Sequence, residues 1–198
     1  MFFKKLIIIT SPPACGKTTL AKKLSRALGE TAYIDKDAFN PFGKQICRLS
    51  GEEYNPDSEF FRRNVRHIEY EVTLEMAFET LEYSSTVVVN GPFGREIRDN
   101  DYMRGLRDRA AALGARLYVV FIEGTPEICR ERMIKRNCAR DLWKFDNWEE
   151  YIKGVNFEPP YALADVVELF IYRNGTDRDE AQSFSELIEF LEKDIKKI

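Results

Sequence analysis

The segment IIITSPPACGKTTLAKKL, residues 7–24, most constrains how this 198-residue chain can fold. Four β-favouring residues run into two prolines and a turn of small residues, and a helical repeat of leucines follows. The turn matches the pattern G-x-x-x-x-G-K-[ST] at every fixed position except the first, where Ser11 replaces glycine. A strand that passes through such a turn into a helix N-terminus predicts a loop built to hold phosphate.

If the loop binds phosphate, the backbone N–H groups from about Ala14 to Thr18 point inward at a triphosphate, at the positive end of a helix dipole. Lys17 neutralises β- and γ-phosphate oxygens, and the Thr18 hydroxyl ligates Mg²⁺. The alternative is a helix start that binds nothing. The nucleotide-binding residues predicted in the loop are Ala14, Cys15, Gly16, Lys17, Thr18 and Thr19.

Five apolar runs outside this loop are continuous rather than alternating and are rich in valine and isoleucine. Such runs are typical of parallel strands buried on both faces, and helical patterns lie between them. A long helix is expected over about 57–81, with Phe61, Val65, Ile68 and Val72 on one stripe, and a last helix is expected from Ser183. We therefore predict one doubly wound α/β domain over residues 1–198. The predicted strands are 6–10, 31–35, 86–90, 116–123 and 166–172.

Composition narrows the classes of protein. The chain is 44% hydrophobic and 32% charged, with a net charge of −3, which argues against a protein that coats extended nucleic acid. The four cysteines show no C-x-x-C spacing, so reduced thiols and a cytoplasmic location are expected. The apolar run near the N-terminus is too short to span a bilayer, and no membrane partner is expected.

Two carboxylates follow the second predicted strand, in the sequence YIDKDAF. Because a parallel sheet presents its chemistry at the carboxyl ends of its strands, Asp35 and Asp37 are expected beside the phosphate loop. Phosphoryl transfer to a hydroxyl needs a carboxylate to accept the proton and groups to hold Mg²⁺. We assign Asp37 as base and acceptor contact, and Asp35 as its helper and a metal ligand. An exposed turn without chemistry is the alternative.

The third predicted strand ends in Asn90, where a Walker-B-type motif has aspartate. Mg²⁺ would then depend on Thr18, phosphate oxygens, water and the two aspartates, while Asn90 hydrogen-bonds water or acceptor. Arg95 follows on an open turn and either faces the acceptor or is a solvated surface arginine. On the long helix, Arg66 is a further candidate for lining the acceptor pocket.

A basic segment, CRERMIKRNCARDLWK, places Arg132, Arg136 and Arg140 at four-residue steps. If the helix persists they share one face, and Asn137 is a candidate for ending it. Arginines on a closing lid offset the charge of the transferred phosphoryl group. A charge run is otherwise a solvated face. Beside a phosphate loop we favour a lid over about 130–145, with Arg132 near the nucleotide and the other two catalytic.

Together, SPPACGKT, IDKDAF, VNGPF and RxxxRNxxRDxWK resemble the motifs of small P-loop kinases. The similar groups are the AAA-domain ATP-binding proteins grouped with zeta-toxin kinases, and the kinase domain of phage polynucleotide kinase. The resemblance implies a P-loop NTPase fold with a five-stranded parallel sheet in the order 2-3-1-4-5, sandwiched by helices. It also implies ATP and Mg²⁺ as cofactors, Asp37 as the base, and Arg136 and Arg140 as lid arginines.

The expected function is that of an ATP-dependent kinase that transfers the γ-phosphoryl group to a hydroxyl of a small molecule or nucleotide. Two alternatives remain: a nucleotide-binding regulatory switch that phosphorylates no acceptor, and a polynucleotide 5′-hydroxyl kinase. Neither the identity of the acceptor nor the oligomeric state follows from the sequence.

Overall fold

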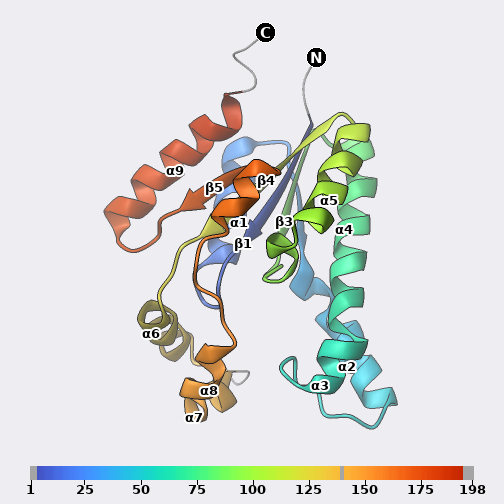
Figure 1. The fold of residues 1–198 in the computed structure, drawn as a ribbon, viewed down its shortest axis with the longest axis vertical. Helices are drawn as coiled ribbons and strands as arrows, with labels where there is room; N and C mark the ends of the chain where they lie inside the picture. Colours follow the sequence, from blue (N-terminus) through green and yellow to red (C-terminus); the bar gives the residue numbers. More distant parts are fainter. Residues whose placement is uncertain (1–3, 139–140, 194–198) are drawn as a thin grey trace.

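Five parallel strands form one sheet in the order β2-β3-β1-β4-β5 in the computed structural model, which describes residues 4–138 and 141–193 (Figure 1). This is the order that the resemblance to P-loop kinases implies. The central strands are the apolar runs of the sequence, and most of their side chains are buried because helices cover both faces. The strands are β1 (Lys4–Thr10), β2 (Ala32–Asp35), β3 (Thr86–Asn90), β4 (Ala115–Ile122) and β5 (Glu168–Tyr172).

Alternate residues of β1 belong to two different cores. Leu6 and Ile8 pack in the cluster that includes residues of α4 and α5, whereas Ile7 and Ile9 pack with residues of α1 and α9. The molecule is therefore a three-layer sandwich of helices, sheet and helices (Figure 1). The covering helices are α1 (Lys17–Leu28), α9 (Asp177–Glu192), α4 (Arg66–Tyr83) and α5 (Asn100–Ala112).

Two groups of shorter helices extend past the carboxyl ends of the strands (Figure 1). One group precedes and adjoins the start of α4, and the other lies between β4 and β5 in the chain. The edge where β1, β2 and β3 end therefore lies toward both groups. The first group is α2 (Asn40–Leu49) and α3 (Glu59–Asn64), the second is α6 (Pro126–Arg136), α7 (Leu142–Asp146) and α8 (Trp148–Lys153), and the 3₁₀ turns are η1 (Lys36–Phe39), η2 (Glu96–Arg98) and η4 (Tyr161–Asp165).

The long helix expected over 57–81 is wrong in two respects. The chain breaks at Val65, whose φ of −123° separates α3 from α4. Separately, the helix α2, which precedes both, was not predicted. The predicted stripe also divides at the break: Phe61 and Val65 are buried, but Ile68 and Val72 are 40% and 38% exposed. After this break, α4 buries other residues in place of Ile68 and Val72, among them Tyr70, Leu74 and Ala77.

The last helix begins earlier than expected. Thr176, not Ser183, caps α9, and its hydroxyl accepts a hydrogen bond from the N–H of Asp179. Ser183 is buried within the helix, where its hydroxyl accepts a hydrogen bond from the N–H of Arg173. The side chain that looked like a cap instead ties α9 to the end of β5.

No helix in the part of the chain that the structure describes is both long and apolar enough to cross a membrane.

Candidate active site

The loop after β1 has the backbone of an anion-binding turn. Ala14 and Gly16 have φ of 59° and 93°, both in the left-handed region. Left-handed residues in such a turn direct successive N–H groups to one side, and α1 begins directly afterwards. Glycine suits position 16 because other residues rarely adopt a φ of 93°, and a Cβ there would also lie 2.9 Å from the Asn174 Nδ2 atom.

Lys17 lies folded back on its own loop. Its Nζ atom donates to the Oγ of Ser11 at 3.1 Å and to the carbonyl oxygens of Ser11 and Pro12 at 3.4 and 3.3 Å. Burial lowers the pKa of Lys17 to about 8, although the nearby Cys15 and Asp37 oppose that shift. The serine that replaces the first glycine of the motif therefore supplies a hydrogen-bond partner for the ammonium group.

Asn174, in the turn after β5, joins the phosphate loop to α6. Its Nδ2 donates to the carbonyl oxygen of Cys15 at 2.9 Å. Arg132 donates to the carbonyl oxygen of Asn174 at 2.7 Å and to its Oδ1 at 3.3 Å. The predicted nucleotide contact Arg132 thus approaches the loop through Asn174. Sequence reasoning did not predict this role of the Asn174 side chain, whose only signal was its place just after the last strand.

Cys15 packs against a second cysteine from a distant part of the chain. The Sγ atoms of Cys15 and Cys129 lie 3.2 Å apart, and both side chains are buried. This hydrogen bond lowers the pKa of the Cys15 thiol. Burial opposes the decrease in pKa, whereas the positive charges of Lys17 and Arg132 contribute to it. The same bond and burial raise the pKa of Cys129. The contact attaches the phosphate loop to α6.

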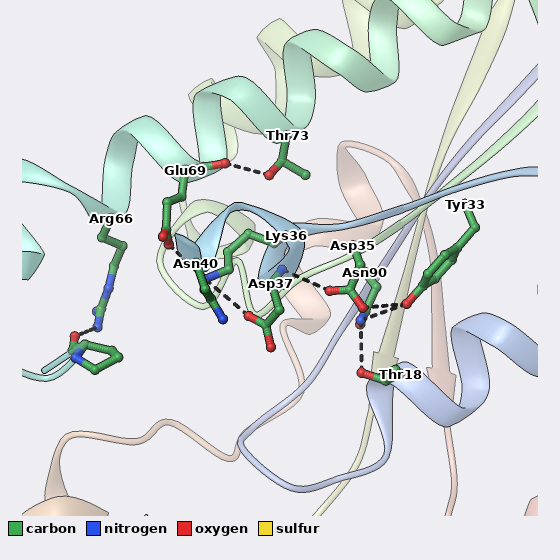
Figure 2. A network of polar contacts seen from close by, with 11 residues as sticks. Thr18, Tyr33, Asp35, Lys36, Asp37, Asn40, Arg66, Glu69, Thr73 and Asn90 are labelled. Carbon is green, nitrogen blue, oxygen red and sulfur yellow. Dashed lines mark hydrogen bonds and ion pairs between the residues drawn. The ribbon is translucent and has the colours of Figure 1, made fainter. Parts of the chain in front are cut away.

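Hydrogen bonds connect Thr18 to the first carboxylate (Figure 2). Asn90 Nδ2 donates to Thr18 Oγ1 at 3.0 Å and to the Tyr33 hydroxyl at 3.3 Å, and that hydroxyl donates to Asp35 Oδ2 at 2.7 Å. Asp35 and Asn90 are paired in the β2–β3 register. The end of β3 has Asn90 in place of an aspartate, and the end of the neighbouring strand β2 supplies the carboxylate of Asp35 beside it. Burial and the bond to Asp35 raise the pKa of Tyr33, which keeps its hydroxyl protonated as a donor.

The side chains around Thr18 fit Mg²⁺. Asn90 Oδ1 is buried and has no hydrogen-bond partner among the described residues. Together with Thr18 and Asp35 it forms a set of oxygen atoms, the ligand type that Mg²⁺ prefers. No group of three or more histidine, cysteine, aspartate or glutamate side chains occurs in residues 4–138 and 141–193 that could hold a metal alone. A metal bound here therefore needs phosphate oxygens and water as further ligands.

Asp37 lies just beyond this network, with its side chain 51% exposed. Its backbone N–H donates to Asp35 Oδ1 at 3.0 Å, and its own Oδ1 lies 3.3 Å from Lys36 Nζ. Lys36 in turn bonds to Glu69, on α4, and sequence reasoning identified neither residue (Figure 2). The first aspartate thus faces the phosphate loop, and the second is accessible beside it.

Comparison of the sequence with known protein families gives one match. The sequence profile of a family described as AAA domain matches residues 6–155, more than half of the chain. This chain belongs to the AAA domain family. No curated protein matches the sequence.

Solved structures similar to this AAA domain include two small kinases. A gluconokinase from Sinorhizobium meliloti has a TM-score of 0.53 at 19% identity, with 96% of this chain and 97% of that chain covered. A shikimate kinase from Acinetobacter baumannii, solved in complex with shikimate, has a TM-score of 0.50 at 13% identity, with 98% and 96% covered. At these identities the likeness establishes the fold, which is that of the small P-loop kinases.

The predicted arginines of this AAA domain lie in different surroundings. Arg66 donates to the Pro56 carbonyl oxygen at 2.6 Å and lies apart from Asp37 (Figure 2). Arg95 is exposed just before η2. Arg136 makes two bonds to the fully buried carboxylate of Asp141, at 2.6 and 2.7 Å.

The predicted lid, over about 130–145, includes the second half of α6 and most of α7. Helix α6 ends at Asn137, which has a left-handed φ of 45°, as the sequence suggested. Arg140, the third arginine of the predicted ladder, lies outside the described residues. The Arg136–Asp141 pair therefore connects the end of α6 to the start of α7.

Proposed function

We propose that this AAA domain is an ATP-dependent kinase that transfers the γ-phosphoryl group to a hydroxyl of a small molecule or nucleotide. The observation that carries the proposal is the hydrogen-bonded series from Thr18 through Asn90 and Tyr33 to Asp35, with Asp37 beside it. A phosphate loop alone would serve any nucleotide-binding protein. A phosphate loop with two adjacent carboxylates also provides for a metal and for a proton acceptor.

The loop and its neighbours bind the donor in this proposal. The N–H groups from Ala14 to Thr19 and the Lys17 ammonium hold the phosphates of ATP, and Arg132 lies near the nucleotide. Thr18 and Asp35 hold Mg²⁺, with Asn90 next to them. When bound, Mg²⁺ neutralises charge on the β- and γ-phosphate oxygens.

Asp37 acts on the acceptor. Its carboxylate accepts the proton of the acceptor hydroxyl as that oxygen bonds to the γ-phosphorus. The bond from the γ-phosphorus to the bridging oxygen breaks, and ADP leaves with that oxygen. Arg136 and Arg140 offset the charge on the transferred group when the lid closes. Arg66, Asn90 and Arg95 are the proposed contacts of the acceptor.

The test combines binding and transfer. ATP binding with Mg²⁺ is measured by calorimetry, and ADP production is then followed over a panel of polyols, sugar acids, nucleosides and 5′-hydroxyl oligonucleotides. Lys17→Ala should abolish ATP binding. Asp37→Asn should leave ATP binding nearly unchanged and remove transfer, because it keeps the size of the side chain and loses the base.

The outcomes separate the alternatives. Tight ATP binding by the wild type without acceptor-dependent ADP production across the panel would contradict the kinase and favour a regulatory switch. If ADP production depends on the 5′-hydroxyl oligonucleotides and on no other acceptor, this would favour the polynucleotide kinase that the sequence motifs resemble. Transfer that survives in Asp37→Asn would show that another group is the base.

A further inference from the structure

A buried ion pair lies beside Asp37, on the side toward α4 (Figure 2). Lys36 Nζ is 2.8 Å from Glu69 Oε2, and these two residues are only 9% and 4% exposed. The same ammonium group donates to Asn40 Oδ1 at 3.1 Å and lies 3.3 Å from Asp37 Oδ1. Lys36 therefore joins α4 to the carboxylate that the proposed function assigns as the base.

A buried ion pair of this kind is expected to add little to the stability of the fold. Removing two charges from water costs free energy, and apolar residues of similar size often replace a buried ion pair without loss. The cost is not fully offset here, since Glu69 Oε1 is buried and has no hydrogen-bond partner among the described residues. Helix α2 also packs against this oxygen: a Cβ on Gly43 would lie 2.7 Å from it.

Lys36 links the Asp37 carboxylate to residues outside its own turn. Its side chain is 51% exposed, so little packing holds the carboxylate in one rotamer. Asp35 Oδ1 fixes the backbone N–H of Asp37, which holds the main chain of this residue in place. The Lys36 ammonium contacts that carboxylate, and Glu69 and Asn40 fix the ammonium in turn.

We propose that Lys36 and Glu69 are positioning residues, which hold the Asp37 carboxylate where the acceptor hydroxyl must approach it. The proposal rests on the proposed function, because it gives the pair a task only if Asp37 is the base. Neither residue touches ATP or acceptor in this account. Glu69 acts through Lys36, and Lys36 acts through Asp37.

The decisive variant removes both charges and keeps the volume: Lys36→Met together with Glu69→Met. We expect its melting temperature to equal or exceed that of the wild type, because no buried charge is left unpaired. Its dissociation constant for ATP should stay within twofold of the wild type. Its kcat should fall by about 100-fold, because a base displaced by about 1 Å loses a rate factor of that order.

Two further sets of variants control for simple damage. Lys36→Met alone leaves the Glu69 carboxylate buried without a cation, so its melting temperature should fall below that of the double variant. The matched surface control is Arg63→Met with Glu59→Met, an ion pair of 3.2 Å whose side chains are 76% and 75% exposed. This control should keep both kcat and melting temperature.

The proposal and the proposed function fail in different ways. A double variant with kcat within threefold of the wild type would overturn the positioning role while the kinase assignment stands. A wild type that phosphorylates no acceptor would remove the proposed function. Crystal structures of the wild type and double variant then decide: an Asp37 carboxylate in the same place in both would overturn the positioning role, and a displaced one would support it.

Discussion

The Lys17 ammonium contacts carbonyl oxygens of its own loop, at 3.3 and 3.4 Å, and the hydroxyl of Ser11. Neutral oxygens are weaker partners for a cation than phosphate is. Burial therefore outweighs them and lowers the pKa of Lys17 to about 8, from an ordinary value of 10.5. A bound triphosphate would favour the protonated form, so ATP binding and proton binding at Lys17 should be coupled.

The first prediction is that the ATP affinity decreases above pH 8. Below about pH 8 Lys17 already carries its proton, whereas above it ATP must bind together with a proton, so the dissociation constant should rise by up to about tenfold per pH unit. Calorimetry at pH 7 and pH 9, each in two buffers of different ionisation enthalpy, measures how many protons the protein takes up when it binds ATP. Uptake should persist in Cys15→Ala, which removes the thiol in the same loop. Equal affinity at both pH values would contradict the coupling.

The same shift affects folding in a defined direction. The folded-state pKa of Lys17 is lower than its ordinary value, so the unfolded chain binds more protons between about pH 8 and 10.5. Lys17 by itself therefore makes folding more favourable as the pH rises through that window. Bound ATP would raise the pKa again and weaken this pH dependence.

At the scale of elements, the phosphate loop and α6 meet through small side chains. Cys15 Sγ lies 3.2 Å from Cys129 Sγ, and a Cβ added to Gly124 would lie 2.2 Å from Cys15 Sγ. Cys15 is fully buried, so its side chain has little room to move aside. The absence of a side chain at position 124 allows the end of β4 to pass beside the loop.

The second prediction concerns Gly124→Ala. Overpacking of this kind costs about 1–3 kcal/mol, so the melting temperature and the ATP affinity should both fall. Adding Cys15→Ala removes the clashing Sγ and should restore the melting temperature, because the added Cβ would then meet the Cys15 Cβ at an ordinary 3.5 Å. Gly105→Ala is the control, since an added Cβ there meets no described atom within 4 Å. A double variant as unstable as Gly124→Ala would refute this account of the contact.

Much of this arrangement could be predicted from local sequence, and the exceptions have a common cause. Continuous Val/Ile runs identified the strands. The phosphate-loop motif pointed to Thr18, and the end of the second predicted strand pointed to Asp35 and Asp37, because each of these signals lies within a short stretch of chain. The break at Val65 carries no glycine or proline, and it arises where Val65 packs with Cys47 and Phe61. Contacts between distant segments carry no local signal: Lys36 and Glu69 are 33 residues apart, and the two cysteines are 114 apart.

At the scale of the whole molecule, the candidate site draws on elements from both faces of the sheet. The phosphate loop leads into α1, whereas Glu69 lies on α4, on the opposite side, and Asn174 precedes α9. Nucleotide bound at this edge would contact or stabilise elements of all three layers. Because ATP binds the assembled site and not the unfolded chain, its binding should stabilise the molecule as one unit.

The third prediction is therefore a single, ATP-dependent thermal transition. ATP with Mg²⁺ at about 100 times its dissociation constant should add about 2.7 kcal/mol of stability, which raises the melting temperature by about 5–10 °C for a chain of this size. Scanning calorimetry should show one peak that moves as a whole, and Lys17→Ala should show the same peak without the shift. Two peaks, of which ATP moves only one, would indicate a second unit that unfolds independently, against a single domain over residues 1–198.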